Sequence, residues 1–251
     1  MAERDELIAA WNEVLRAHEI NDYCPNGLQV EGSAHVSRVA FAVSVSLTLF
    51  QQAWAWGAQM IVVHHGLLWS RDGGPIRRSF KERLKFLLCN DITLVGYHLP
   101  LDRHPELGNN AQACQKLGLI EVKPFALYQG RDIGFWGQQP PEPADSFFAR
   151  VRSCYGRDLH IFGAGPQQIR TVGIVSGGAA NHMKDALDLH LDCFISGEVE
   201  EYTPRQAEEE GIHYVAAGHY ATERLGIMAL EQWTARNLEV ETRFIDIDNP
   251  V

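Results

Sequence analysis

The 251-residue sequence has no long apolar run, no signal-peptide pattern and no paired cysteines. Its apolar runs are far shorter than the ~20 residues that a membrane helix needs, so we expect no membrane-spanning segment. The chain opens with the polar, acidic residues 1–6 rather than a leader, and we expect a cytoplasmic protein. The five cysteines form no CxxC pair, which argues against a thiolate zinc site and predicts reduced, mostly buried thiols.

Positive charge and phosphate-binding motifs are also scarce. The formal net charge is −10, from 22 Lys and Arg against 32 Asp and Glu, so nucleic acid and anionic membranes are not expected partners. Neither GxGxxG nor GxxxxGK[ST] occurs, which removes the common nucleotide-binding loops. What remains is ordinary: 45% hydrophobic and 22% charged residues are typical of a globular protein and exclude disorder.

Short apolar runs alternate with amphipathic segments along most of the chain. We expect strands near 38–45, 60–63, 92–97, 172–175, 193–196, 214–217 and 240–247. Helices are expected near 4–18, 47–56, 79–90, 108–117, 145–155, 183–189, 204–210 and 221–233. The alternation predicts an α/β fold with two α/β lobes, whose mostly parallel sheets are flanked by helices.

The segment 122–165 departs from this alternation. A strand is expected at 134–136, and Pro140, Pro141 and Pro143 should end it. This mixed segment places the lobe boundary between residues 123 and 124, giving lobes 1–123 and 124–251.

Three of the expected buried strands run directly into metal-ligating residue types. These residues are His64 and His65, then His98 and Asp102, then His219 and Glu223. Ligands bind at the carboxyl ends of strands in open α/β sheets, so we expect these side chains to meet between the lobes, with 214–251 completing the site. Imidazoles and carboxylates without sulfur suit zinc, iron, manganese, cobalt or nickel. With this many candidates, two ions sharing a bridging carboxylate is the natural arrangement. A hydrogen-bonded structural role is the alternative for any single histidine.

Two charged features are weaker signals. The stretch 71–85 is locally basic and begins at Arg71. One hypothesis is that it binds the phosphate groups of the substrate. The alternative is a solvated loop and helix face. Glu198 follows the expected strand 193–196 and is a candidate to support the metal ligands or to line their rim.

At these residues the sequence resembles the NIF-three-like dinuclear-metal proteins, also labelled GTP cyclohydrolase I type 2. The matching segments follow in chain order: Asn26-Gly27-Leu28-Gln29-Val30, Val63-His64-His65-Gly66, His98-Leu99-Pro100-Leu101-Asp102, Gly108-Asn109-Asn110, Ser196-Gly197-Glu198 and Gly218-His219-Tyr220-Ala221-Thr222-Glu223. One departure is visible, because many members have an aspartate in the segment matching 44–48 and this chain has none.

The resemblance implies a toroidal homohexamer, built as a trimer of dimers, with a dinuclear site facing its interior. It implies that the metal ligands are His64, His65, Asp102, His219 and Glu223, the residues that the strand ends also select. His98 matches a family histidine close to the metals, with an acid/base or supporting role. The family label implies opening of a purine imidazole ring with release of formate.

Three hypotheses for function follow. The first is a metal-dependent hydrolase acting on a nucleotide, with His98 moving the proton. The second is a non-catalytic ring that serves as a metal-binding scaffold or interaction protein, favoured by the lack of a base-recognition motif. The third, processing of single-stranded nucleic acid inside a ring, conflicts with the net charge of −10.

Overall fold

The computed structural model describes residues 1–70 and 74–251, which form two compact units. Unit 1 comprises Met1–Leu101 and Ile227–Asp248, and unit 2 comprises Asp102–Gly226 and Asn249–Val251. The units therefore divide after Leu101 and after Gly226, whereas the sequence analysis placed one boundary at 123/124. The boundary after Gly226 arises because the C-terminal strand pairs with an N-terminal strand in unit 1. Arg71, where the basic stretch begins, lies outside the described residues.

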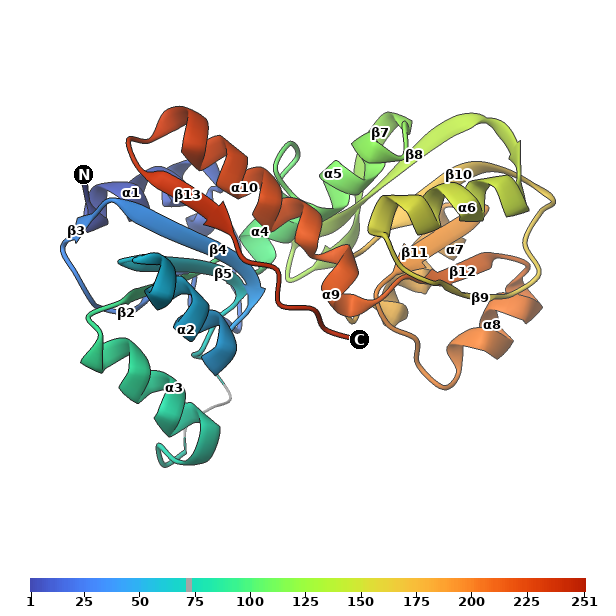
Figure 1. Cartoon of the computed structure of the whole chain (residues 1–251). Helices are drawn as coiled ribbons and strands as arrows, with labels where there is room; N and C mark the ends of the chain where they lie inside the picture. Colours follow the sequence, from blue (N-terminus) through green and yellow to red (C-terminus); the bar gives the residue numbers. More distant parts are fainter. Residues whose placement is uncertain (71–73) are drawn as a thin grey trace. The chain divides into compact units, whose positions relative to one another are not determined.

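Unit 1 is built on a five-stranded sheet in the order β13-β4-β5-β6-β2 (Figure 1). Its strands are β2 (Gly27–Val30), β4 (Arg38–Ser44), β5 (Met60–His65), β6 (Thr93–Gly96) and β13 (Glu241–Phe244). All neighbours are parallel except β2, which pairs antiparallel with β6 at the edge. A small antiparallel pair, β1 (Ala2–Glu3) with β3 (His35–Val36), belongs to the same unit.

Helices cover both faces of this sheet, which explains why its central strands are apolar on both sides. The helices are α1 (Arg4–Val14), η1 (Ala17–Glu19), α2 (Leu47–Trp56), α3 (Arg78–Cys89) and α10 (Arg224–Asn237), of which 227–237 belong to unit 1. Phe50 of α2 packs in one cluster with Ala42 of β4 and Ile61 of β5. On the other face Trp11 of α1 meets Phe41 edge-on at 6.0 Å between ring centroids.

Unit 2 is built on a mixed six-stranded sheet in the order β7-β8-β10-β11-β12-β9. Its strands are β7 (Ile120–Tyr128), β8 (Arg131–Pro143), β9 (His160–Phe162), β10 (Gln168–Ile174), β11 (Cys193–Ser196) and β12 (His213–Ala216). Only β10, β11 and β12 run parallel. The sheet is therefore mixed rather than mostly parallel, because β7 and β8 form a hairpin and β9 adds an antiparallel edge.

The prediction that three prolines end the strand after residue 136 was wrong. β8 continues to Pro143, and its pairing with β10 shifts register between Ile169 and Thr171. Pro140 and Pro141 fall within that irregularity, where the ladder does not need their missing N–H groups.

The helices of unit 2 pack on both faces of its sheet. They are α5 (Asn109–Lys116), α6 (Ala144–Tyr155), η2 (Ala180–His182), α7 (Met183–Asp188), α8 (Thr203–Glu210) and α9 (His219–Thr222). Phe147 and Val151 of α6 share a core cluster with Val172, Ile195 and Val215 of three neighbouring strands. The short helix α4 (Leu99–Arg103) carries the chain across the division at Leu101.

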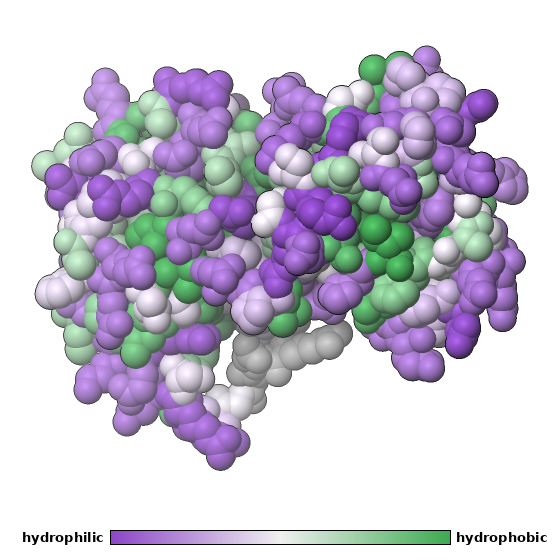
Figure 2. All heavy atoms as spheres, turned by 45° about the vertical axis from the view of Figure 1, so that its right-hand side comes forward, coloured by the Kyte–Doolittle hydropathy of each residue, from purple (hydrophilic) through white to green (hydrophobic). Residues whose placement is uncertain are grey.

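The helix expected at 221–233 is two helices. α9 ends at Thr222, and Glu223 separates it from α10 with φ −107° and ψ 3°. No helix within the described residues is long and apolar enough to cross a membrane. Hydrophilic side chains are spread over the face drawn in Figure 2, with apolar patches between them.

Candidate metal site

Unit 1 brings together the three histidines that follow its buried strands. One ring nitrogen from each of His64, His65 and His98 lies within 4.8 Å of the others. The ring centroid of His64 is 4.7 Å from that of His65 and 5.1 Å from that of His98. His64 is fully buried and the side chain of His98 is 7% exposed, so these imidazoles are held within the protein.

Each of these imidazoles has its Nδ1 atom hydrogen-bonded to an oxygen. His64 Nδ1 donates to the carbonyl oxygen of Tyr97 at 2.9 Å. His65 Nδ1 lies 2.9 Å from the Ser44 hydroxyl, and His98 Nδ1 donates to Asp22 at 3.0 Å. A neutral imidazole that donates from Nδ1 carries its lone pair on Nε2, which is the pattern of histidines that bind metals.

Asp22 is a functional candidate that the sequence analysis missed. Its carboxylate is 1% exposed and accepts four hydrogen bonds. His98 Nδ1 and Cys24 N donate to Oδ1, while Leu99 N and Asn26 Nδ2 donate to Oδ2. Burial opposes ionisation, but the hydrogen bond and charge of His98 together with the backbone donors lower the Asp22 pKa below its usual value. The buried Asp22 carboxylate therefore fixes the orientation of the His98 ring.

Gln29 braces the loop that leaves β5 after His65. Its Oε1 accepts hydrogen bonds from Leu67 N at 2.7 Å and Leu68 N at 3.2 Å. Its amide donates to the carbonyl oxygen of Pro25 at 2.9 Å. A side chain on Gly66 would overlap the Gln29 amide, so glycine is required there for close packing. This contact gives a structural reason for the Asn26–Val30 segment of the family pattern, which has no metal ligand of its own.

Unit 2 brings His219 and Glu223 together, as their spacing predicted, and adds Glu198. His219 lies between the two carboxylates, with Nδ1 at 2.6 Å from Glu198 and Nε2 at 3.2 Å from Glu223. Burial alone would lower the His219 pKa, but hydrogen bonds and charge from Glu223 and Glu198 raise it to about 9. A proton on His219 therefore balances two carboxylates in the metal-free chain. The role foreseen for Glu198 as a support of a ligand agrees with this contact.

The backbone of unit 2 approaches Glu223 closely at Gly177. This glycine has φ +69°, a region that other residues rarely adopt, and it follows Ser176 after β10. An added Cβ would overlap Glu223 Oε1 and lie 3.2 Å from His219 Nε2. No sequence motif predicted a role for this loop, although its Gly177-Gly178 pair is visible in the chain.

Asp102 is buried and fixed within unit 2. Its Oδ1 accepts hydrogen bonds from Asn109 Nδ2 at 2.9 Å and from the Ser176 hydroxyl at 3.0 Å. Asn109 also accepts from Gly226 N at 2.8 Å through its own Oδ1, and Asn110 donates to the Asp102 carbonyl. The Gly108-Asn109-Asn110 segment of the family pattern thus supports Asp102 directly.

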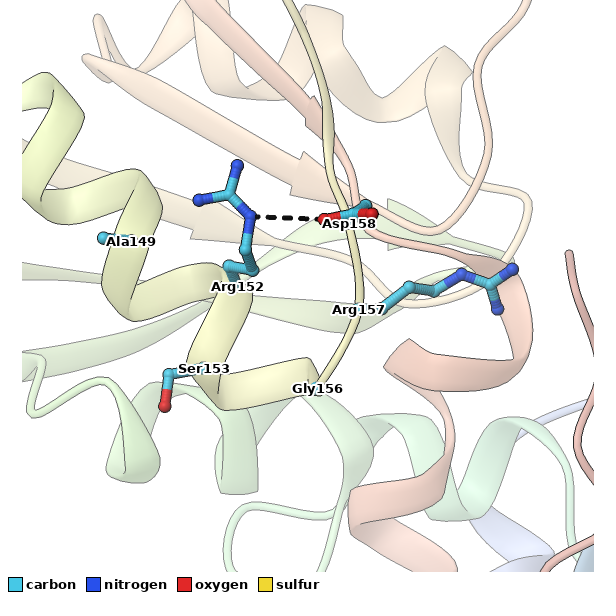
Figure 3. Close-up of a pocket in the computed structure, with 6 residues that line it drawn as sticks. All are labelled: Ala149, Arg152, Ser153, Gly156, Arg157 and Asp158. Atoms are coloured by element: carbon cyan, nitrogen blue, oxygen red, sulfur yellow. Dashed lines mark ion pairs between the residues drawn. The ribbon is translucent and has the colours of Figure 1, made fainter.

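Two other features of the structure hold none of these residues. The described part of the basic stretch is mainly solvent-exposed on and before α3, and Lys81 lies 3.9 Å from Glu82. A cavity of about 530 Å³ adjoins the C-terminal end of α6 in unit 2 (Figure 3). Its Arg152 faces Asp158 at 3.6 Å, and its Arg157 donates to the Asn249 carbonyl.

Comparison with known proteins identifies the family. Residues 2–250 match the family described as Duf34/NIF3 (NGG1p interacting factor 3). This chain belongs to the DUF34/NIF3 family. The resemblance drawn from the motifs is therefore confirmed.

DUF34/NIF3 relatives match this chain over nearly its whole length. A Pasteurella multocida protein named GTP cyclohydrolase 1 type 2 homolog is 44% identical over 248 residues, and 98% of each chain is covered. An Escherichia coli K12 protein of the same name is 41% identical over 250 residues, again with 98% of each covered.

Solved structures show the same α/β fold. One, described as protein ybgI of unknown function, has a TM-score of 0.94 and 40% identity, covering 100% of both chains. Another, TTHA1606 from Thermus thermophilus, has a TM-score of 0.90 and 30% identity with the same coverage.

Proposed function

We propose that this DUF34/NIF3 chain is a metal-dependent hydrolase in which His64, His65, Asp102, His219 and Glu223 hold two divalent transition-metal ions. The observation that carries the proposal is the shared orientation of the imidazoles. His64 and His98 each donate to an oxygen through Nδ1, and this leaves Nε2 as the lone-pair nitrogen of the neutral ring. Structural histidines need no such common tautomer.

The residues fit a pair of transition-metal ions in their chemistry. Neutral imidazoles and carboxylates suit zinc, iron, manganese, cobalt or nickel, and thiolates are not part of the set. Glu223 is 4% exposed at its side chain, and a bound cation would balance its charge in place of the proton on His219. Ions bound by such a set supply Lewis acidity to a hydrolytic reaction.

Two of the proposed ligands lie close in sequence to the points where the chain passes from one unit to the other. Asp102 begins the unit 2 segment and follows His98 by four residues along α4. Glu223 lies three residues before Gly226, where the chain returns to unit 1. Asp102 and Glu223 are therefore held at the ends of the segment that forms most of unit 2.

His98 is the proposed acid/base residue. Its Nδ1 is committed to Asp22, so Nε2 is the atom that accepts a proton from attacking water and returns it to the leaving group. Asp22 holds this tautomer and stabilises the protonated ring, as a buried carboxylate does for a catalytic histidine. The hydrogen bond from His98 N to Asn26 Oδ1, 2.9 Å, fixes the backbone at the same place.

The proposed substrate is a nucleotide, which the names of the relatives favour. We also propose that the chain assembles as a toroidal homohexamer, a trimer of dimers, as the family resemblance implies. Light scattering should then give a particle six times the mass of the chain. A monomeric mass for the metal-loaded protein would contradict the assembly without affecting the metal site.

The test is an assay of guanosine 5′-triphosphate hydrolysis by metal-loaded protein, in which the release of formate is measured. His98→Ala should lower kcat by roughly 10²–10⁴-fold with unchanged metal content. The exposed His160→Ala variant is the matched control and should keep full activity. Absence of hydrolysis by fully metallated wild type across a nucleotide panel would contradict the proposal and favour the non-catalytic scaffold.

A further inference from the structure

Two aromatic side chains of unit 1 pack around the His98 imidazole. The ring centroid of Tyr23 lies 5.0 Å from that of His98 at an interplanar angle of 72°, and that of Trp69 lies 5.3 Å away at 79°. Trp69 is also 6.0 Å from the ring of His65. Tyr23 and Trp69 adjoin each other at 5.5 Å with planes inclined by 30°. Neither the metal-ligand role nor proton transfer accounts for this pair.

Hydrogen bonds hold the Trp69 ring and the backbone at Tyr23 in place. Trp69 Nε1 donates to the Gly66 carbonyl at 3.1 Å, within the loop that leaves β5. Ser70 N donates to the Tyr23 carbonyl at 2.7 Å, which ties the two loop segments together. The Asp22 carboxylate that orients His98 also accepts a hydrogen bond from Cys24 N at 3.1 Å, which fixes the backbone on both sides of Tyr23. A ring that binds here meets a preorganised surface.

The aromatic pair is not part of the core. Tyr23 is 38% exposed, although the neighbouring Cys24 is 1% exposed, and Trp69 is only partly buried. Large aromatic rings beside a polar cluster are a common feature of ligand sites, where apolar walls surround a few placed polar groups. The aromatic face binds flat rings of any base, because each base has a π-face. A cationic ligand is disfavoured here, because bound metal ions would repel it.

We infer that Tyr23 and Trp69 form a stacking wall that binds the heteroaromatic ring of the substrate beside His98. The inference rests on the proposed function and names the part of a nucleotide that the site recognises. It also supplies the base-recognition element that the sequence motifs lack. The competing role is that both rings only shield the His98–Asp22 pair from water, and the two roles differ in what the ring of the ligand contributes to affinity.

The experiment compares two probes on zinc-loaded protein by isothermal titration calorimetry. Guanosine 5′-monophosphate carries the ring, and ribose 5-phosphate carries the same sugar and phosphate without it. The variants are Tyr23→Ala, Tyr23→Phe, which keeps the ring, and Tyr202→Ala, a control at another exposed tyrosine, in unit 2. Zinc content and thermal unfolding are measured for every variant.

Wild type should bind guanosine 5′-monophosphate more tightly than ribose 5-phosphate. Tyr23→Ala should weaken binding of the nucleotide by about tenfold or more, which is the usual effect of removing a stacking partner. Its affinity for ribose 5-phosphate and its zinc content should be unchanged. Tyr23→Phe and Tyr202→Ala should bind as wild type does. Equal affinity of wild type for both probes, no binding of the nucleotide, or full nucleotide affinity in Tyr23→Ala would overturn the inference. Failure of the wild-type protein to bind zinc would instead refute the proposed function.

Discussion

Replacing Asp22 with asparagine should destabilise the protein despite the near-identical shape of the two side chains. Both carboxylate oxygens accept two hydrogen bonds. An amide NH2 on the Oδ2 side faces the donors Leu99 N and Asn26 Nδ2, and on the Oδ1 side it faces Cys24 N and forces His98 into its other tautomer. Asn26 cannot turn its own amide to compensate, because its Oδ1 already accepts from His98 N. Two buried bonds to a charged acceptor are lost at about 1–2 kcal/mol each, which gives about 2–4 kcal/mol.

The assay is urea unfolding of wild type, Asp22→Asn and Asp158→Asn. Asp158 is fully exposed and is the matched control, for which we expect a change within about 0.5 kcal/mol. If Asp22→Asn unfolds within the same range as this control, the reasoning from its four donors is refuted.

Wild type and Asp22→Asn also test the charge on Asp22. The pKa of Asp22 is lowered in the folded state, so its ionisation stabilises the fold above the ordinary value of 3.8 and this stabilisation is lost as pH falls through the lower folded value. The difference in free energy of unfolding between wild type and Asp22→Asn should therefore be constant near neutral pH and shrink only below about pH 4. A difference that already shrinks near pH 6 would contradict this assignment.

Three further predictions concern the metal, the glycine loop and the thiols. Gly177→Ala and Gly211→Ala should each cost about 1–2 kcal/mol, because both glycines have φ +69°, but only Gly177→Ala should also lose metal, since its Cβ overlaps Glu223. A chelator should lower the Tm of wild type and leave the Tm of His64→Ala unchanged. The free energy of unfolding of wild type should fall by about 2.7 kcal/mol if the free metal concentration was 100 times its Kd. Alkylation of the native chain should give one adduct by intact mass, at the exposed Cys89, because the other four cysteines are buried.

Local pattern was enough to predict most helices and strands. The strand at 193–196 and the helix at 47–56 are confirmed as predicted, because continuous apolar runs and a glycine stop are strong local signals. The edge strands β2, β7 and β9 were missed or left unassigned, because edge strands are half-exposed and carry polar residues. Return of β13 to unit 1 is a long-range pairing that no local pattern contains.

Some residues of the candidate site could be predicted from the sequence, and others could not. Histidines at strand ends were visible because they follow buried runs directly, and unit 1 brings His64, His65 and His98 together. Asp22 was not visible, because it lies in a loop 76 residues before His98 and is defined only by the folded contact. The aromatic residues Tyr23 and Trp69 were hidden for the same reason, because their packing against each other exists only in the folded chain.

The central claim is that this chain holds two metal ions through its strand-end histidines and carboxylates. The most direct measurement is metal content per chain by elemental analysis, on protein purified without chelator, for wild type, His64→Ala and His160→Ala. The account predicts about two ions in wild type and in His160→Ala, and loss of metal in His64→Ala. Wild type that stays metal-free after reconstitution, or His64→Ala that keeps both ions, would contradict it.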